Sequence, residues 1–290
     1  DVSIIEVASA KVTPLANTAA AESDPLYSPD GKAIAILASD NPPRWAQAGV
    51  IQIFSTSGGQ PKNLVASFDA QPAIVGWSAD GKRIYFSEAK GTGTQIYALD
   101  IAANRIEEIK TTPAVIGAID LNRTGTMFGF VRQTSDTPPD AFVASVTDFT
   151  PVQITRVNDQ VKLPAMGRTE VITWKSTDGK QVEGLLTYPV GYQAGQRVPL
   201  ILNIHGGPAG VFQQTFLGGR GVYPLATFSA RGYAVLRPNP RGSSGYGTEF
   251  RRANMKDWGV GDYQDLMTGV DKVIEMGVAD PERLGVMGWS

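Results

Sequence analysis

The stretch that decides the fold of the first half of the chain is Ser28-Pro-Asp-Gly-Lys-Ala-Ile-Ala-Ile-Leu-Ala-Ser39. It joins a turn-forming tetrad to an apolar run. The tetrad returns as Ser78-Ala-Asp-Gly81 before "RIYFSE", and in weaker form as Asn122-Arg-Thr-Gly125 before "TMFGFV". Ser or Asn in the first position and Gly in the fourth suit a type I turn. A β-prone run after each turn predicts three β-hairpins.

A second signal repeats in phase with these turns. Four segments have a strand–turn–strand pattern, and their last apolar residues are Leu15, Leu64, Ile109 and Ile154. Four short strands in roughly 45 residues is the period of a β-propeller blade. We therefore expect residues 1–160 to form the C-terminal blades of a β-propeller. The end of one blade comes first, and three whole blades follow. An ordinary β-sandwich with common turns is the alternative.

Beyond about residue 165, apolar strands alternate with helical patterns. A hairpin over residues 170–189 is followed by predicted strands at 198–204, 233–239 and 283–288. Helices are predicted at 223–230, 249–255 and 262–276, the last with an apolar face. This alternation favours a mostly parallel sheet buried on both faces. We expect residues 161–290 to form the N-terminal part of an α/β domain.

Two strand ends in this second part have sequences suited to catalysis. The run "RLGVMGWS" carries an apolar strand into Gly288-Trp289-Ser290. A serine on a sharp turn at a strand end is typical of nucleophiles in serine hydrolases, where a second glycine follows two residues later. That second glycine lies outside this sequence, and a surface serine at a strand end is the alternative. The cluster of residues 242–245 has Tyr246 in place of the second glycine and is interpreted as a loop.

The run "NIHGGPAG", residues 203–210, follows the other strand. Glycines directly after a buried strand leave backbone N–H groups open to a ligand. Gly206 and Gly207 are therefore candidates to bind the oxyanion of an acyl-transfer intermediate. A phosphate-binding loop is the rival interpretation, but the usual phosphate-loop motifs are absent. His205, the single histidine, precedes the serine, and we expect it to support this loop rather than act as the general base.

The composition limits the classes of function. The net charge is −2 with both signs interspersed, which gives no footprint for nucleic acid or an anionic membrane. The sequence has no apolar run of roughly 18 residues, the length that a transmembrane helix needs. The absence of cysteine excludes disulfides and thiolate metal sites. Compartment and oligomeric state stay undecided.

Several segments together resemble the prolyl oligopeptidase family of serine peptidases, and its acylaminoacyl-peptidase branch above all. They are "ITWKSTDGKQVEGLLTYP", "LILNIHGGPAG", "NPRGSSGYG", "DWGVGDYQD" and "DPERLGVMGWS". The resemblance implies a propeller followed by an α/β-hydrolase domain that is incomplete at the nucleophile. It implies Ser290 as the nucleophile, Gly207 with Gly206 as oxyanion donors, short peptides as substrates, and no cofactor. Arg241 and Tyr246 match a glycine-rich loop near the site, without a catalytic role.

The chain also departs from that family. The triad aspartate and histidine, the residue after the serine and the early blades are outside it. We therefore expect a fragment of a longer serine peptidase, inactive by itself because triad members act as a unit. An esterase on the same fold, or a propeller-based binding protein with an inactive hydrolase domain, are the alternatives.

Overall fold

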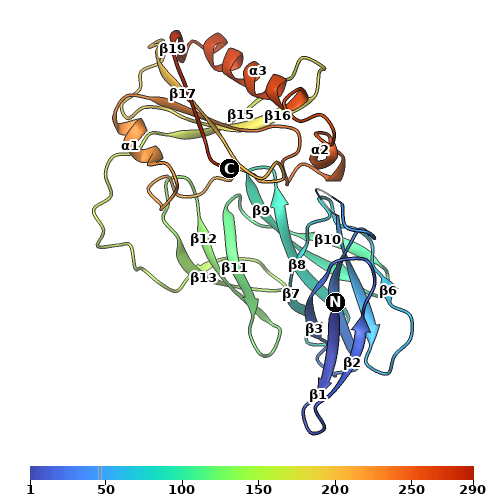
Figure 1. The fold of residues 1–290 in the computed structure, drawn as a ribbon. Coiled ribbons are helices and arrows are strands. Elements are labelled where there is room, and N and C mark those ends of the chain that lie inside the picture. The colour runs from blue at the N-terminus through green and yellow to red at the C-terminus, as the bar shows by residue number, and fades with distance from the viewer. Residues whose placement is uncertain (45, 47) are drawn as a thin grey trace.

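The computed structural model describes residues 1–44, 46 and 48–290. Its first half consists of three four-stranded antiparallel sheets and a two-stranded hairpin (Figure 1). The hairpin is β1 (Val2–Glu6) and β2 (Lys11–Ala16). The first sheet is β3 (Glu22–Tyr27), β4 (Ala33–Ser39), β5 (Gly49–Ser55) and β6 (Lys62–Asn63). The second is β7 (Ala73–Trp77), β8 (Arg83–Lys90), β9 (Gly93–Asp100) and β10 (Arg105–Ile109). The third is β11 (Val115–Leu121), β12 (Met127–Gln133), β13 (Asp140–Ser145) and β14 (Val152–Gln153). The predicted repeat of four short strands is confirmed.

The repeated tetrads form the predicted turns. The backbone bond that closes each turn measures 2.9 Å in Ser28–Gly31, Ser78–Gly81 and Asn122–Gly125. Each fourth-position glycine has a φ between 64° and 69°, in the left-handed region that favours glycine. Side-chain hydrogen bonds stabilise the turn further: the Ser28 hydroxyl donates to Asp30 at 2.7 Å and accepts from the Ala33 N–H at 2.9 Å. The second copy repeats both bonds, so the sequence repeat is a structural one.

The second half contains a five-stranded sheet with the order β15-β16-β18-β17-β19. Its strands are β15 (Thr169–Lys175), β16 (Gln181–Thr187), β17 (Val198–Ile204), β18 (Ala234–Asn239) and β19 (Ala279–Gly288). The pairs of β17 with β18 and with β19 are parallel, whereas the β15–β16 and β16–β18 pairs are antiparallel. The strands that alternate with helices, β17, β18 and β19, are parallel as predicted, and the predicted hairpin forms the β15–β16 pair. The antiparallel β16–β18 pair was not predicted, so only two of the four pairs are parallel and the sheet is not mostly parallel.

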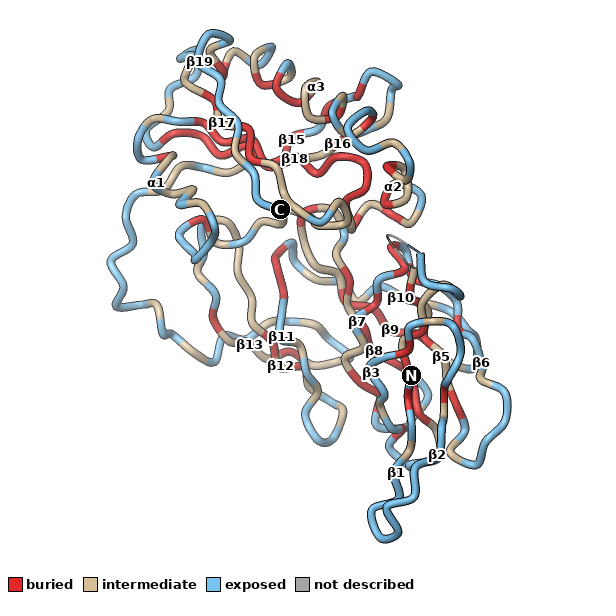
Figure 2. The backbone as a smooth tube through the Cα atoms, in the orientation of Figure 1, coloured by how far each residue is buried: buried red, intermediate tan, exposed pale blue. Residues whose placement is uncertain are grey.

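Burial differs along this sheet. β18 is buried throughout, but most of β19 is exposed at one sheet edge (Figure 2). At the other edge, β15 alternates buried and exposed residues, so the prediction of a sheet buried on both faces was wrong for both edge strands. β19 also begins earlier than predicted. Its register with β17 jumps from Val198–Ala279 to Leu200–Leu284, so Asp280 and Pro281 lie in an irregularity inside the strand.

Three helices accompany the sheet: α1 (Leu225–Ala230), α2 (Thr248–Arg252) and α3 (Gly261–Glu275). All three lie within two residues of their predicted starts. α3 packs Val270 and Val273 into a core that also contains Trp174 of β15 and Leu236 of β18. The Trp174 indole donates to the Asp265 carbonyl at 2.9 Å, which fixes α3 on the sheet. Within the described residues, none of the helices has the length and apolarity needed to cross a bilayer.

The two halves meet along the loop of residues 240–247. The Gly91 N–H donates to the Gly245 carbonyl at 2.8 Å, and the Gly247 N–H donates to the buried Asp69 carboxylate at 3.0 Å. Gln213 donates to the Gly93 carbonyl at 2.6 Å. These bonds hold the ends of the first-half sheets against the loops that follow β17 and β18.

Candidate active site

β17 and β19 are parallel, so the segments that follow them leave the sheet at the same end of the strands. The two strands are parallel and in register to their last residues, with Ile204 opposite Gly288 (Figure 1). The glycine loop, residues 205–210, therefore starts beside Trp289 and Ser290. Tyr223 adds a tether here, because its hydroxyl donates to the Gly288 carbonyl at 2.6 Å.

Gly206 lies directly against Ser290. A β-carbon on Gly206 would be 2.5 Å from Ser290 Cβ, 3.2 Å from its Oγ and 2.4 Å from the Trp289 carbonyl oxygen. Any side chain at residue 206 would therefore displace the serine. Ser290 has a φ of 74°, a left-handed conformation that is uncommon outside glycine. Such strain clusters at active sites and fits the sharp turn expected of a nucleophile.

The glycine loop keeps its leading N–H groups unused. Among the described residues, neither the Gly206 N–H nor the Gly207 N–H donates a hydrogen bond to the protein. Gly207 has a φ of 45°, and its carbonyl accepts from the Gly210 N–H across the loop. Unused backbone N–H groups in a loop that contacts the serine are what an oxyanion site requires.

His205 holds the glycine loop to the loop of residues 240–247. Its Nε2 lies 3.0 Å from the Ser243 hydroxyl, and its Nδ1 lies 3.3 Å from the Gly206 carbonyl. Next to it, the Ser244 hydroxyl donates to the Ala209 carbonyl at 2.6 Å. Burial lowers the pKa of His205, only partly offset by its contact with Gly206, which keeps the ring neutral at pH 7. These contacts are those of a supporting residue.

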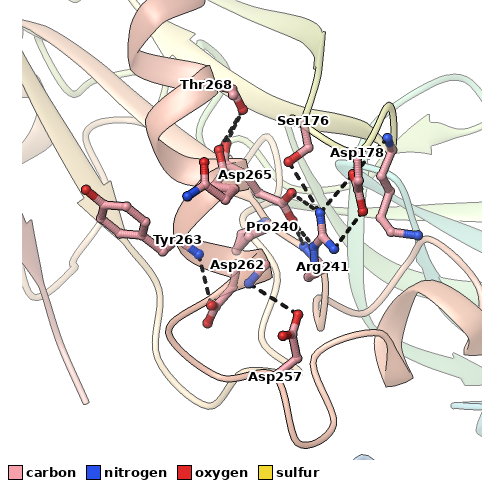
Figure 3. A network of polar contacts seen from close by, with 12 residues as sticks. Ser176, Asp178, Pro240, Arg241, Asp257, Asp262, Tyr263, Asp265 and Thr268 are labelled. Atoms are coloured by element: carbon pink, nitrogen blue, oxygen red, sulfur yellow. Dashed lines mark hydrogen bonds and ion pairs between the residues drawn. The ribbon is translucent and has the colours of Figure 1, made fainter.

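Arg241 and Tyr246 hold the loop of residues 240–247 in place. The Arg241 guanidinium donates to Asp265 at 2.7 and 2.9 Å and to Asp178 at 2.9 and 3.1 Å (Figure 3). Hydrogen bonds to Asp265 raise the pKa of Arg241. The Tyr246 hydroxyl donates to Glu183 at 2.8 Å. The loop that supports the glycine loop is thus itself held by a buried ion-pair network.

Two cavities adjoin at Gly206. One, of about 440 Å³, is lined by Arg44, Ala46, Gln71, Gly206, Gly207, Ala209, Gly210 and Arg251. The other, of about 290 Å³, is lined by Asn203, Ile204, His205, Gly206, Phe212, Thr215, Gly221, Val222, Tyr223, Leu225, Arg237 and Trp289. The sequence did not predict that Tyr223 and Arg237 line the second cavity. The one signal for Arg237 in the sequence was a charged residue directly after the apolar residues that begin β18.

The sequence of this chain is similar to those of known peptidases. Residues 223–290 match the family model described as the prolyl oligopeptidase family. An uncharacterized peptidase of Bacillus subtilis, YuxL, is 31% identical to this chain over 79% of it and 34% of its own length. Residues 223–290 thus carry the sequence of the prolyl oligopeptidase family. Another relative is dipeptidyl-peptidase 5 of Porphyromonas gingivalis, 24% identical over 92% of this chain and 38% of its own length.

Solved structures share the fold at lower identity. The acylaminoacyl peptidase of Pyrococcus horikoshii superposes with a TM-score of 0.72 at 23% identity, over 89% of this chain and 39% of that one. A puromycin-hydrolyzing peptidase of Mycobacterium tuberculosis gives a TM-score of 0.68 at 20% identity, over 93% and 41%. This chain therefore spans only about a third to two fifths of the length of these four proteins.

Proposed function

We propose that Ser290 is the nucleophile of a serine peptidase that cleaves short peptides by acyl transfer. In this proposal residues 161–290 begin an α/β-hydrolase domain, and residues 1–160 are blades of a propeller that covers the site. One observation carries the proposal: a serine in a left-handed conformation at a strand end, in contact with a glycine whose N–H is free.

The chemistry proceeds through an acyl-enzyme. Ser290 Oγ forms a bond to the carbonyl carbon of the peptide while its proton passes to a general base. The carbonyl oxygen becomes negative and accepts hydrogen bonds from the Gly206 and Gly207 N–H groups, each of which is worth about two to three orders of magnitude in rate. The C–N bond then breaks, and the leaving amine takes the proton from the base. Water hydrolyses the serine ester by the same route.

The general base is not His205, because that ring is bound to Ser243 and Gly206. It is the only histidine of this sequence. We place the base and its aspartate in the part of the relatives' length that this chain does not match. Triad members act as a unit, so the 290-residue chain by itself is expected to be inactive.

The substrate class follows from the position of the site between the two halves. Arg44 and Gln71, from loops of the first-half sheets, line the same cavity as Gly206 and Gly207. A site bordered by both halves admits short peptides more readily than folded proteins. Peptide cleavage also agrees with relatives described as a dipeptidyl-peptidase and an acylaminoacyl peptidase.

Active-site labelling of the full-length polypeptide tests the proposal. A fluorophosphonate probe should modify Ser290, identified by peptide mass, and Ser290→Ala should abolish both labelling and peptide cleavage. Ser57→Ala, at an exposed serine, is the matched control. Normal peptide cleavage by the Ser290→Ala variant would refute the proposal. Hydrolysis of p-nitrophenyl esters without hydrolysis of the matching anilides would favour an esterase instead.

A further inference from the structure

Arg237 is a buried cation without a counter-charge. It lies in the middle of β18, its side chain is 2% exposed, and its Nε and Nη2 atoms have no hydrogen-bond partner among the described residues. No carboxylate among those residues is within ion-pair distance of it. The two positions that the structure does not describe, 45 and 47, are Trp and Gln and carry no charge. Burial alone lowers its pKa to about 10, which leaves the group charged at pH 7.

The other buried arginines of this region differ from it. Arg241, four residues along, is bound by two carboxylates. Arg251 also makes no guanidinium hydrogen bond among the described residues, but it has the Asp69 carboxylate as a counter-charge at 3.9 Å. An unpaired charge in the protein interior is strongly destabilising, so a purely structural arginine is expected to have a counter-charge, as these two do.

The Arg237 side chain faces the 290 Å³ cavity beside Ser290. Its Cζ atom is 5.8 Å from the centre of the Phe212 ring, and Tyr223 and Trp289 contribute further aromatic walls. No aspartate or glutamate of the described residues lines this cavity, nor the 440 Å³ cavity on the other side of Gly206, where Arg44 and Arg251 supply the charges. Both cavities thus have arginine in their walls and no carboxylate among their described lining residues, which suits an anion.

We propose that the 290 Å³ cavity is a substrate subsite in which the Arg237 guanidinium binds a carboxylate of the peptide. The carboxylate comes from an aspartate or glutamate side chain, or from the carboxy terminus. The planar fork of arginine matches a carboxylate with two parallel hydrogen bonds. The inference rests on the proposed function for the identity of the ligand as a peptide, but the anion site itself does not depend on hydrolysis.

Binding to the full-length Ser290→Ala variant tests this without turnover. Calorimetry would compare acetyl-Ala-Glu-Ala-amide with acetyl-Ala-Gln-Ala-amide, and with acetyl-Ala-Gln-Ala bearing a free carboxy terminus. We expect one of the two carboxylate peptides to bind about 10- to 100-fold more tightly than the neutral peptide, the range for a hydrogen bond to a charged group. The carboxylate peptide that binds more tightly than the neutral peptide shows whether the carboxylate comes from a side chain or from the carboxy terminus. Equal binding of all three would overturn the inference.

Variants of Arg237 connect the preference to this side chain. Arg237→Met should bind the three peptides with equal affinity. Arg237→Lys should keep a reduced preference for the carboxylate peptide, because its charge remains but its two parallel hydrogen bonds are lost. Arg105→Met, at an exposed arginine of β10, should leave the preference unchanged. If Arg237→Met fails to melt cooperatively, the lysine variant decides, and a full preference in folded Arg237→Lys would overturn the inference.

The two proposals fail separately. Fluorophosphonate labelling of Ser290 without any carboxylate preference would remove the subsite and leave the peptidase. A carboxylate preference that depends on Arg237, without labelling, would leave the anion site and remove the nucleophile.

Discussion

At residue 206 the absence of a side chain brings two loops into contact. Gly206 has an ordinary negative φ, so its requirement for glycine is steric: a methyl group would meet Ser290 and the Trp289 carbonyl. Gly207 is the opposite case. Nothing lies within 4 Å of its missing β-carbon, but its φ is 45°. Adjacent glycines are thus required for two different physical reasons.

Alanine at each position should separate these reasons. Gly206→Ala should lower fluorophosphonate labelling of Ser290 at least 100-fold, because the serine is displaced. Gly207→Ala should instead cost about 1–2 kcal/mol of unfolding free energy through left-handed strain. Labelling rates and urea denaturation measure the two effects. Gly117→Ala, where space is open and φ is not positive, should change neither, and full labelling of Gly206→Ala would contradict the steric argument.

Within the network that supports the loop of residues 240–247, substitution of Arg241 should lower the free energy of unfolding the most. Arg241→Met leaves the Asp265 carboxylate, 0% exposed, buried without its ion-pair partner, with only the backbone N–H of residue 241 still donating to it. Breaking a buried pair on one side costs about 3–5 kcal/mol. Chemical denaturation should show a loss of that size, with a smaller loss for Arg241→Lys. A loss below about 1 kcal/mol for the methionine variant would mean that water replaces the arginine.

At the scale of elements, α3 illustrates how packing overrides propensity. Gly269 sits in the helix interior, where glycine is a poor choice by about 1 kcal/mol relative to alanine. A β-carbon there would lie 2.7 Å from Cζ2 of Trp174, a ring that is fixed by its bond to the Asp265 carbonyl. Glycine is therefore selected by the close approach of helix and sheet.

Gly269→Ala should consequently destabilise the protein. Overpacking of a filled core costs about 1–3 kcal/mol, which exceeds the gain in helix propensity. We expect a net loss of about 1 kcal/mol, seen as a lower midpoint in thermal melting followed by near-UV circular dichroism. Gly129→Ala in β12, with open space around it, is the matched control. A rise in the melting temperature of Gly269→Ala would show that Trp174 can move.

Local elements were predictable from the sequence, and their long-range pairing was less so. The three turns and the helix over residues 262–276 depend on neighbours a few positions apart, and both were predicted correctly. The antiparallel pairing of β16 with β18 depends on contacts between distant segments, which periodicity does not reveal.

The same division holds for the site. Ser290, Gly206 and Gly207 were predicted from strand ends, and the structure brings them together, while their catalytic roles stay predictions. Arg237 could not be assigned, because burial without a partner is a property of the folded chain.

At the scale of the whole molecule, an ion pair links the two halves beside the 440 Å³ cavity. Arg252 of α2 donates to both carboxylate oxygens of Asp40, at 2.9 and 3.1 Å. Burial alone would raise the pKa of Asp40, but the Ala48 N–H and the Arg252 guanidinium outweigh burial and leave the pKa below its usual 3.8. The stabilisation from Asp40 is therefore present above pH 3.8 and is lost as the pH falls through the lowered value.

Arg252→Gln should follow this pH dependence. At pH 7 we expect the variant to be about 1 kcal/mol less stable than the parent, since the pair is partly exposed. The difference should persist at pH 5 and disappear as Asp40 becomes protonated below pH 3.8. Urea denaturation at several pH values measures it, and Lys82→Gln, at an exposed pair, is the control. A constant difference across the range would show that Asp40 is not the partner that matters.

The pairing of β17 with β19 has a consequence for the order in which the molecule folds. The turns of the first half join residues no more than five positions apart, and such hairpins form in about 1–10 μs. Ile204 and Gly288 meet only after the long intervening segment has closed, and distant contacts form slowly. Ser290 should therefore reach its position against Gly206 late in folding. The corner where the proposed chemistry takes place should thus form after the hairpins of the first half.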